Sequence, residues 1–206
     1  MSQVADWNIN LRLVTRTRLV ARERRDSHLF MYEIEAKVRL SEADFKRLKE
    51  EIPRFALKVK CVINKDSYYN HGMKDYSLRI REQNGKSILN LKSKRRGEGI
   101  EFNHEIELPL KSASGFHSFL KKIGIGLHAK KEKKSEIYRA DKMRIELNTI
   151  KRLGHFLEIE ILANSQSGIP AAKKALLKVF RKLGFNSDDF EKKYYLEMLS
   201  EIGKNK

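Results

Sequence analysis

Charged residues of the same sign occur two positions apart at several places in this sequence. The acidic pairs are Glu33 with Glu35, Glu105 with Glu107 and Glu158 with Glu160, and the basic pairs are Arg79 with Arg81 and Lys92 with Lys94. Two carboxylates at this spacing on a β-strand lie on one face, only about 7 Å apart, and they repel each other. The spacing becomes favourable when a divalent cation lies between them, since Mg²⁺ and Mn²⁺ prefer oxygen ligands. The acidic pairs therefore predict a site for Mg²⁺ or Mn²⁺.

Basic pairs beside such a cation predict a site for a highly charged phosphate compound. Lysine and arginine bind non-bridging phosphate oxygens, the metal neutralises charge on the transferred group, and a carboxylate orients water. A second interpretation stays open, because charged faces of half-exposed strands are often simply solvated. The same-sign pairs favour the first interpretation, since solvated strands commonly mix in threonine, serine and glutamine.

The charged residues alternate with apolar ones, as in Ile34, Ala36 and Val38, which is the pattern of β-strands. The expected strands cover residues 32 to 40, 57 to 70, 76 to 83, 87 to 95, 101 to 109, 127 to 139, 142 to 149 and 155 to 162. Capping signals and helical spacing predict helices at 41 to 51, 112 to 123, 169 to 183 and, after caps at 186 to 188, a last helix through 199. Many strands with helices inserted singly predict an antiparallel α+β domain. A closed eight-stranded β-barrel would let all the charged faces converge on one ligand.

The composition is that of a folded, strongly basic protein. The 206 residues are 40% hydrophobic, and 44 Lys and Arg against 27 Asp and Glu give a formal charge of +17. This charge attracts polyanions without choosing among nucleic acid, polyphosphate and nucleotides. Residues 1 to 30 carry scattered arginines and no sustained period. They are expected to be a basic extension, as an arm, a targeting peptide or translated sequence before Met31, followed by one domain over 31 to 206.

The sequence contains few signals for cellular location or for binding partners. The single Cys61 cannot form an internal disulfide, and we see no apolar run of the ~20 residues that span a membrane, so a cytoplasmic location is expected. The lysine-rich stretch 130 to 134 and the basic side of the 169 to 183 helix are expected to be solvated. Docking of nucleic acid to them is less favoured, because interleaved aromatic residues are not seen. The oligomeric state is not predicted, and a homodimer stays open.

In order and spacing, several motifs resemble those of CYTH proteins, or triphosphate tunnel metalloenzymes. That family includes class IV adenylyl cyclases, thiamine triphosphatases and inorganic triphosphatases. Residues 33 to 37 match its ExExK signature, 66 to 70 and 78 to 81 resemble its D-x-Y-Y/F and LRIR elements, and 91 to 94 its L-x-x-K strand. Residues 153 to 160 resemble LGxFxEIE, and 193 to 199 the terminal K-S-Y-x-x-L-L helix. The resemblance covers residues 31 to 199 and implies the closed tunnel barrel.

The resemblance implies a role for each matching position. The metal ligands would be Glu33, Glu35, Glu158, Glu160 and the amide of Asn148. The catalytic group would be Glu105, Glu107 and Lys37. The residues that bind the phosphate chain would be Lys37, Arg79, Arg81, Lys92, Lys94, Lys133, Arg144 and Lys193. The cofactor would be Mg²⁺ or Mn²⁺, and the partner a small molecule that contains a triphosphate.

Three positions depart from the family pattern. Asn148 and Ser135 stand where an acid and an arginine are usual, and Asn103 stands where an arginine often precedes the fifth-strand glutamates. The leading prediction is a metal-dependent phosphohydrolase of inorganic triphosphate or of a nucleoside or thiamine triphosphate. The alternatives are a class IV adenylyl cyclase and a non-catalytic binder of triphosphate, polyphosphate or RNA ends.

Overall fold

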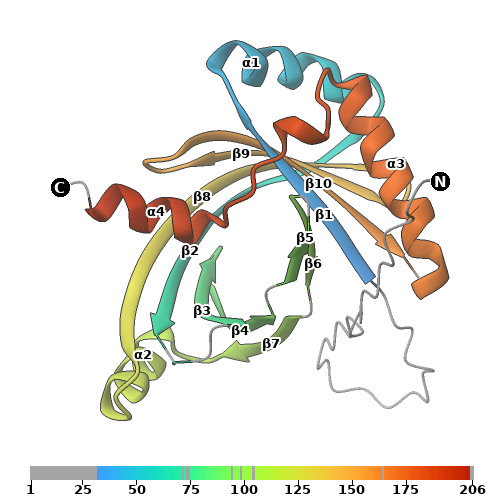
Figure 1. Ribbon diagram of the computed structural model, residues 1–206. Helices are drawn as coiled ribbons and strands as arrows, with labels where there is room; N and C mark the ends of the chain where they lie inside the picture. Colours follow the sequence, from blue (N-terminus) through green and yellow to red (C-terminus); the bar gives the residue numbers. More distant parts are fainter. Residues whose placement is uncertain are drawn as a thin grey trace.

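One curled antiparallel sheet forms the body of the protein (Figure 1). The computed structural model describes residues 32–70, 72, 75–93, 95–97, 99–103, 105–163 and 165–204, so the predicted extension lies outside the described residues. The strands are β1 (Tyr32–Leu40), β2 (Leu57–Asn70), β3 (Tyr76–Gln83), β4 (Lys86–Ser93), β5 (Arg95–Gly97), β6 (Ile100–Asn103), β7 (Glu105–Leu110), β8 (Gly126–Ala140), β9 (Met143–Ile150) and β10 (Gly154–Ala163). Their order in the sheet is β5-β6-β1-β10-β9-β8-β2-β3-β4-β7.

The predicted closed barrel of eight strands is wrong in strand number and in closure. The described residues form an open, strongly curled sheet of ten strands. The difference lies in the segment 86 to 110, which was expected to supply two strands and supplies four, β4 to β7. Its first part, β4, pairs with β3, whereas β6 pairs with β1 at the far side of the sheet. This segment therefore lies between the two sides of the curl. The other predicted strands are confirmed to within a residue or two.

Four α-helices pack against the curled sheet, three on its outer side and the last at its concave side (Figure 1). They are α1 (Glu42–Glu51), α2 (Ala113–Lys122), α3 (Ile169–Lys182) and α4 (Tyr195–Lys204), with short 3₁₀ turns η1 (Ile52–Arg54), η2 (Gln166–Gly168) and η3 (Ser187–Asp189). The first three helices are confirmed, and the predicted last helix is wrong at its start. Asn186 does cap a helix, but that helix is η3, since Phe190 next bridges to Val38 of β1 and α4 begins only at Tyr195.

The apolar faces of the strands lie on the convex side of the curled sheet, and the charged faces lie on its concave side. Apolar residues of β1, β9 and β10 pack beneath α1 and α3, with Ile34, Val38 and Ile145 all fully buried. The alternating charged residues point to the concave side, where they too are buried. They include Lys37, Asp66, Arg79, Glu101, Lys131, Lys133, Glu146 and Glu158. The interpretation of this face as solvated is therefore wrong.

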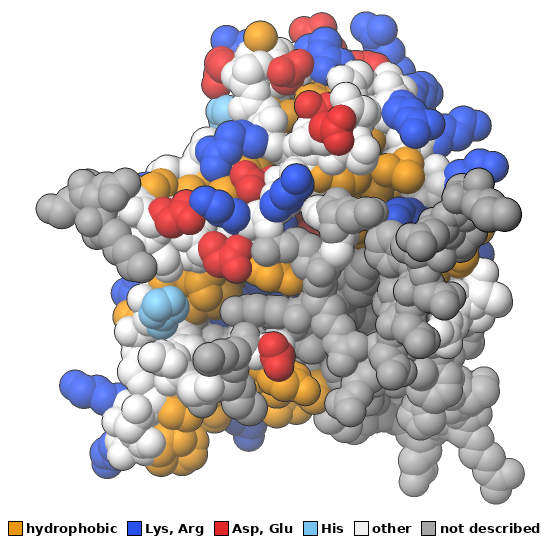
Figure 2. Space-filling model, viewed as in Figure 1, with side chains coloured by type: hydrophobic (Ala, Val, Ile, Leu, Met, Phe, Trp, Pro, Cys, Tyr) orange, Lys and Arg blue, Asp and Glu red, His pale blue; other side chains and the backbone are white. Residues whose placement is uncertain are grey.

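The basic residues of α3 behave as a solvated face. Lys174, Lys178, Arg181 and Lys182 are exposed, as expected from the sequence. Figure 2 shows many lysine and arginine side chains over the region of α1 and α3. In the described part of the chain, no helix is long and apolar enough to cross a membrane.

Gly99 allows the segment after η3 to cross close to β6. Its φ of +78° is a left-handed conformation, and a Cβ there would lie 2.7 Å from Cβ of Phe190. We expect Gly99→Ala to lower the free energy of unfolding by roughly 1 to 3 kcal/mol in urea titrations. Gly85→Ala is the matched control, since Gly85 has a φ of +74° and open space around it. Equal losses in the two variants would contradict a role for the Phe190 contact.

Candidate functional site

A cluster of glutamates lies where β1 runs between β6 and β10. Glu35 is paired in register with Glu160 of β10 on one side and with Glu101 of β6 on the other. Directly opposed residues of an antiparallel ladder project from the same face, so these carboxylates converge. Burial raises the pKa of Glu35 to about 8, and the surrounding glutamates add to this shift. Burial also raises the pKa of Glu160, and the negative charge of Glu35 contributes.

Glu33, Glu35 and Glu160, here called the acidic cluster, have the donor chemistry of a divalent-cation site. All their donors are carboxylate oxygens, which Mg²⁺ and Mn²⁺ prefer. The raised pKa values of Glu35 and Glu160 come first from burial and then from neighbouring negative charge, and a bound cation would counter both effects. Among the described residues, no three His, Cys, Asp or Glu side chains are already arranged to hold a metal ion. The cluster therefore fits the cation by chemistry and needs side-chain rotation to complete a coordination shell.

Glu158 has a different environment from the acidic cluster. The ammonium of Lys133 lies 3.0 Å from Glu158 Oε2 and 2.8 Å from Glu146 Oε2, and Asn148 Nδ2 donates to Glu158 over 2.8 Å. Burial alone would raise the pKa of both glutamates, but the charge of Lys133 holds the pKa of each below its usual range. Lys133, predicted to bind phosphate, thus neutralises two buried carboxylates. Glu158, predicted to bind metal, is already engaged by a cation.

Two departures from the family pattern are neighbours across a ladder. Ser135 of β8 pairs in register with Asn148 of β9, and both side chains are fully buried. Ser135 Oγ and Asn148 Oδ1 are buried oxygens without a hydrogen-bond partner. At the two positions where the family usually has an arginine and an acid, this chain therefore has a neutral pair. Its two unpaired oxygens can accept hydrogen bonds from a ligand or from water.

This pairing predicts a compensating effect between two substitutions. Asn148→Asp replaces the amide that donates to Glu158 with a second carboxylate, so we expect a loss of roughly 1 to 3 kcal/mol of unfolding free energy. Ser135→Arg should recover part of that loss, because the guanidinium would face the new charge. A double-mutant cycle measured by urea unfolding tests this coupling. Strictly additive effects would contradict it.

The opposite wall of the curl is basic and is organised around Asp66 of β2. Arg81 Nε and Nη2 donate to the two Asp66 oxygens over 2.7 and 2.9 Å, and Lys131 Nζ lies 3.1 Å from Oδ2. Arg79 Nη1 lies 3.8 Å from Asp66 Oδ2. The expectation that residues 130 to 134 are solvated is wrong for Lys131 and Lys133, which are 6% and 8% exposed. Strand alternation turns these two inward, whereas Lys130 and Lys134 point out.

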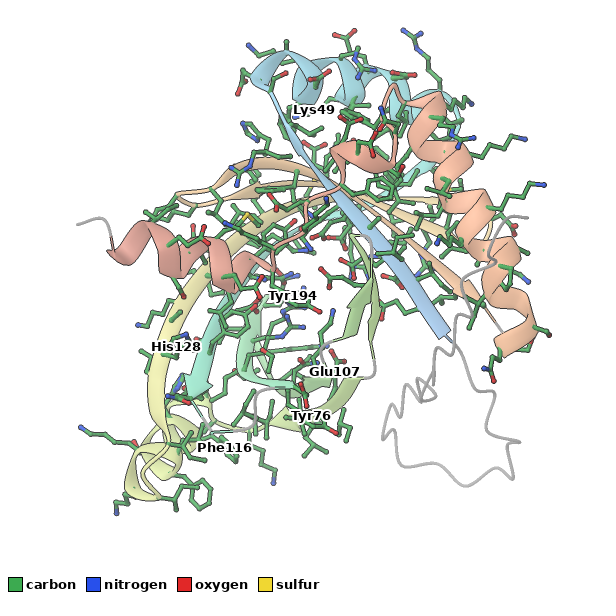
Figure 3. All side chains as sticks on the ribbon, viewed as in Figure 1. Lys49, Tyr76, Glu107, Phe116, His128 and Tyr194 are labelled. Atoms are coloured by element: carbon green, nitrogen blue, oxygen red, sulfur yellow. The ribbon has the colours of Figure 1, made fainter. Side chains whose placement is uncertain are left out.

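Lys37 and Lys92 lie between the acidic and basic walls. Lys37, only 2% exposed, forms an ion pair with Glu101, and its ammonium lies 5.6 Å from the ring centre of Tyr194 and 5.4 Å from that of Tyr195. Lys92 Nζ lies 3.9 Å from Glu35 Oε2. In Figure 3, Tyr194 from the segment before α4 and Glu107 from β7 both lie on the concave side of the sheet. Asn90 Nδ2 donates to Glu107 over 3.4 Å.

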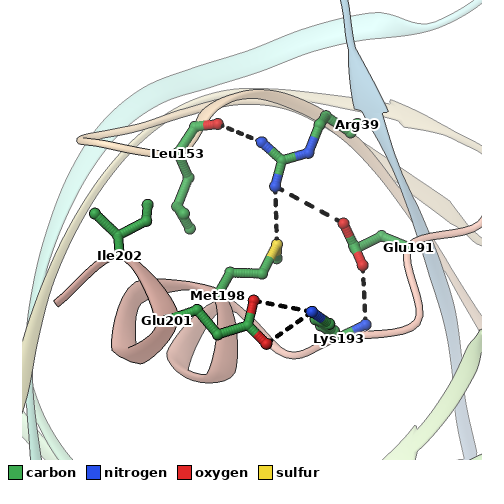
Figure 4. Close-up of a pocket in the computed structure, with 7 residues that line it drawn as sticks. All are labelled: Arg39, Leu153, Glu191, Lys193, Met198, Glu201 and Ile202. Atoms are coloured by element: carbon green, nitrogen blue, oxygen red, sulfur yellow. Dashed lines mark hydrogen bonds and ion pairs between the residues drawn. The ribbon is translucent and has the colours of Figure 1, made fainter. Parts of the chain in front are cut away.

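The remaining predicted residues differ in where they lie. Arg144 pairs with Glu146 and lies 4.0 Å from Glu160, so it adjoins the acidic cluster. Lys193 is exposed, pairs with Glu201 at 2.7 Å, and lines a separate pocket of about 420 Å³ beside α4 (Figure 4). Its position gives no support to the phosphate role predicted for it. Lys94 and the side chain of Glu105 lie outside the described residues.

Sequence reasoning missed several residues of this interior. No role was predicted for Glu101, Glu146, Asp66, Lys131 or Tyr195, all of which lie beside predicted site residues. Burial and the adjacent charge of Glu158 raise the pKa of the Tyr195 hydroxyl well above its usual range. Glu146 lies two positions from Arg144 and from Asn148, which were both predicted as site residues, so period-two counting along β9 would have marked it.

The described strands form a curled antiparallel sheet with an acidic and a basic group of side chains on its concave side. The sequence profile of the CYTH domain matches residues 31–195. The chain belongs to the CYTH domain family.

Individual relatives agree with this assignment. A curated protein of Methanocaldococcus jannaschii, named as a candidate adenylate cyclase, is 24% identical over 174 residues, which are 82% of this chain and 98% of that protein. A solved structure from Pyrococcus horikoshii is 29% identical, with a TM-score of 0.70 over 80% of this chain and 98% of that one. A Hippeastrum protein, described as having a dominant triphosphatase activity, has a TM-score of 0.58 at 19% identity, covering 82% and 95% of the two chains. The last likeness shows the fold alone.

Proposed function

We propose that the protein is a metal-dependent phosphohydrolase of a triphosphate compound, with the substrate bound inside the curled sheet. One observation carries this proposal: the acidic cluster and the Asp66-centred cations face the same concave interior. A triphosphate needs both walls, because its oxygens are neutralised partly by protein cations and partly by a divalent metal.

The two walls would have separate roles. Glu33, Glu35 and Glu160 would hold Mg²⁺ or Mn²⁺, which when bound supplies positive charge against the phosphate chain. Arg79, Arg81 and Lys131 would hold non-bridging oxygens through charge-assisted hydrogen bonds. Hydrolysis then joins a water oxygen to the terminal phosphorus and breaks the bond to the bridging oxygen, which releases orthophosphate and the shortened chain. Lys37 and Lys92, which lie beside Glu101 and Glu35, would balance negative charge during this change.

The relatives give partial support for this reaction type. The activity described for the Hippeastrum protein belongs to that protein, and it shows that this fold accommodates triphosphate hydrolysis. The name of the Methanocaldococcus relative favours a second candidate, in which ATP is cyclised and pyrophosphate leaves. Both reactions use the same walls and differ in which phosphorus is attacked.

Identification of the products separates these candidates. Purified protein with Mg²⁺ or Mn²⁺ would be given inorganic triphosphate, ATP and thiamine triphosphate, and the products followed by ³¹P NMR and chromatography. Orthophosphate supports hydrolysis, whereas cyclic AMP with pyrophosphate supports the cyclase. Calorimetric binding without turnover of any of the three compounds would contradict hydrolysis and favour a non-catalytic binder.

A further inference from the structure

One buried carboxylate on β2 brings together cations from two neighbouring strands. Asp66 is 1% exposed and lies in register with Arg81 of β3 and with Lys131 of β8. Both of its oxygens accept from Arg81, and Lys131 and Arg79 approach Oδ2 at 3.1 and 3.8 Å. Burial would raise the pKa of Asp66, but these cations hold it well below its usual range.

The position of Asp66 decides where the three cations point. Three positive groups this close repel one another, so without an anion among them they would turn apart. Arg81 uses Nε and Nη2 on Asp66, which fixes the guanidinium plane and leaves the opposite edge directed away from β2. The three cations and one carboxylate leave a net charge of two positive units, so the group still attracts an anion.

Lys131 also contacts two tyrosine rings, one of which belongs to the C-terminal helix α4. Its ammonium lies 5.5 Å from the ring centre of Tyr68 and 5.2 Å from that of Tyr195, the first residue of α4. A cation between two aromatic faces is stabilised without losing its charge. Asp66 and the two rings thus confine Lys131 in the interior, although its exposed neighbours Lys130 and Lys134 lie in bulk water.

We propose that Asp66 is a positioning residue, which aims Arg79, Arg81 and Lys131 at the phosphate chain before substrate arrives, and that Lys131 is a third phosphate-binding cation. This inference rests on the proposed function. Asp66 touches no substrate atom in this role, and its effect is to remove the cost of gathering the cations when the ligand binds.

Asp66→Asn tests the inference, because it keeps the shape of the side chain and removes the charge. For inorganic triphosphate we expect KM, and the calorimetric Kd, to rise about tenfold or more, as expected for loss of a charged hydrogen bond. We expect kcat to change much less, since the acidic cluster on the opposite wall is untouched. Lys131→Met should raise KM in the same direction.

Glu136→Gln is the matched control. Glu136 is also a buried carboxylate of the sheet, held by Lys49 and Lys58 at 2.7 and 2.5 Å, but it lies on the convex side under α1. Loss of the Glu136 charge should lower the unfolding midpoint about as much as Asp66→Asn does. It should leave KM and Kd for inorganic triphosphate unchanged. A purely structural role of Asp66 would make the two variants behave alike.

The outcomes separate this inference from the proposed function. Wild-type protein that binds inorganic triphosphate, together with a folded Asp66→Asn variant of unchanged Kd and KM, would overturn the role of Asp66 alone. Wild-type protein that neither binds nor cleaves inorganic triphosphate, ATP or thiamine triphosphate would overturn both. A selective rise in Kd for Asp66→Asn, seen even without turnover, supports the positioning role.

Discussion

Glu35→Ala is expected to reduce metal-dependent triphosphate turnover by at least about 100-fold, since even groups that only support a metal ligand are worth up to this much. Glu35 lies between Glu101 and Glu160 in the ladder, so its loss removes the central carboxylate of the group. We expect the unfolding midpoint to stay unchanged or to rise, because the substitution removes a buried acid whose ionisation is disfavoured by burial and by the neighbouring glutamates. Initial rates with Mn²⁺, together with thermal unfolding, test both expectations.

The same residue predicts how metal binding depends on pH. Burial raises the pKa of Glu35 to about 8, so below that pH a cation has to displace a proton to bind. The apparent affinity for Mn²⁺ should therefore rise between about pH 6 and pH 8 and level off above that range. Glu35→Ala should lose most of this rise. Glu50→Ala, on the exposed side of α1, is the control and should keep both the rise and the turnover. An unchanged pH dependence in Glu35→Ala would remove this carboxylate from the metal site.

Most of the fold follows from alternation along the chain. The strand that carries Glu33 and Glu35 was predicted with its actual bounds because Ile34, Ala36 and Val38 interrupt the charges regularly. Alternation does not reveal which strands become neighbours. Glu101 was missed because its role comes from lying opposite Glu35 across a ladder between residues far apart in the sequence.

The errors arose where the local sequence pattern gives no signal. In β8 the run around Lys131 and Lys133 is charged on both faces, so no apolar residue marks which lysines point inward. The cap at Asn186 was recognised correctly, but the sequence does not indicate that Phe190 has a partner in Val38, which ends the helix after one turn. Both errors concern contacts between distant segments, and those contacts also form the interior site.

Lys133→Met is expected to lower the free energy of unfolding by about 3 to 5 kcal/mol at neutral pH, the usual consequence of removing one partner from a buried ion pair. Lys133 lies within 3.0 Å of both Glu146 and Glu158, so one substitution removes the cation that two buried carboxylates share, and Glu146 keeps only its pair with Arg144. Guanidinium titrations of the two proteins measure the difference. Lys193→Met is the control, because that lysine is exposed and its pair with Glu201 should contribute nothing measurable.

The pH dependence of this loss distinguishes charge from packing. Lys133 holds the pKa of Glu146 and Glu158 below the ordinary value, so their stabilising contribution is present above about pH 4.5 and is lost as pH falls through their folded-state pKa values. In Lys133→Met the two buried carboxylates lose their shared cation, so acid should relieve the variant by protonating them. The difference between the two proteins should therefore be largest near neutral pH and should shrink toward about pH 3. Adding Glu146→Gln to Lys133→Met should restore part of the stability. A loss that is independent of pH would mean that Lys133 acts through packing of its alkyl chain, and its assignment as the neutralising cation of this wall would be wrong.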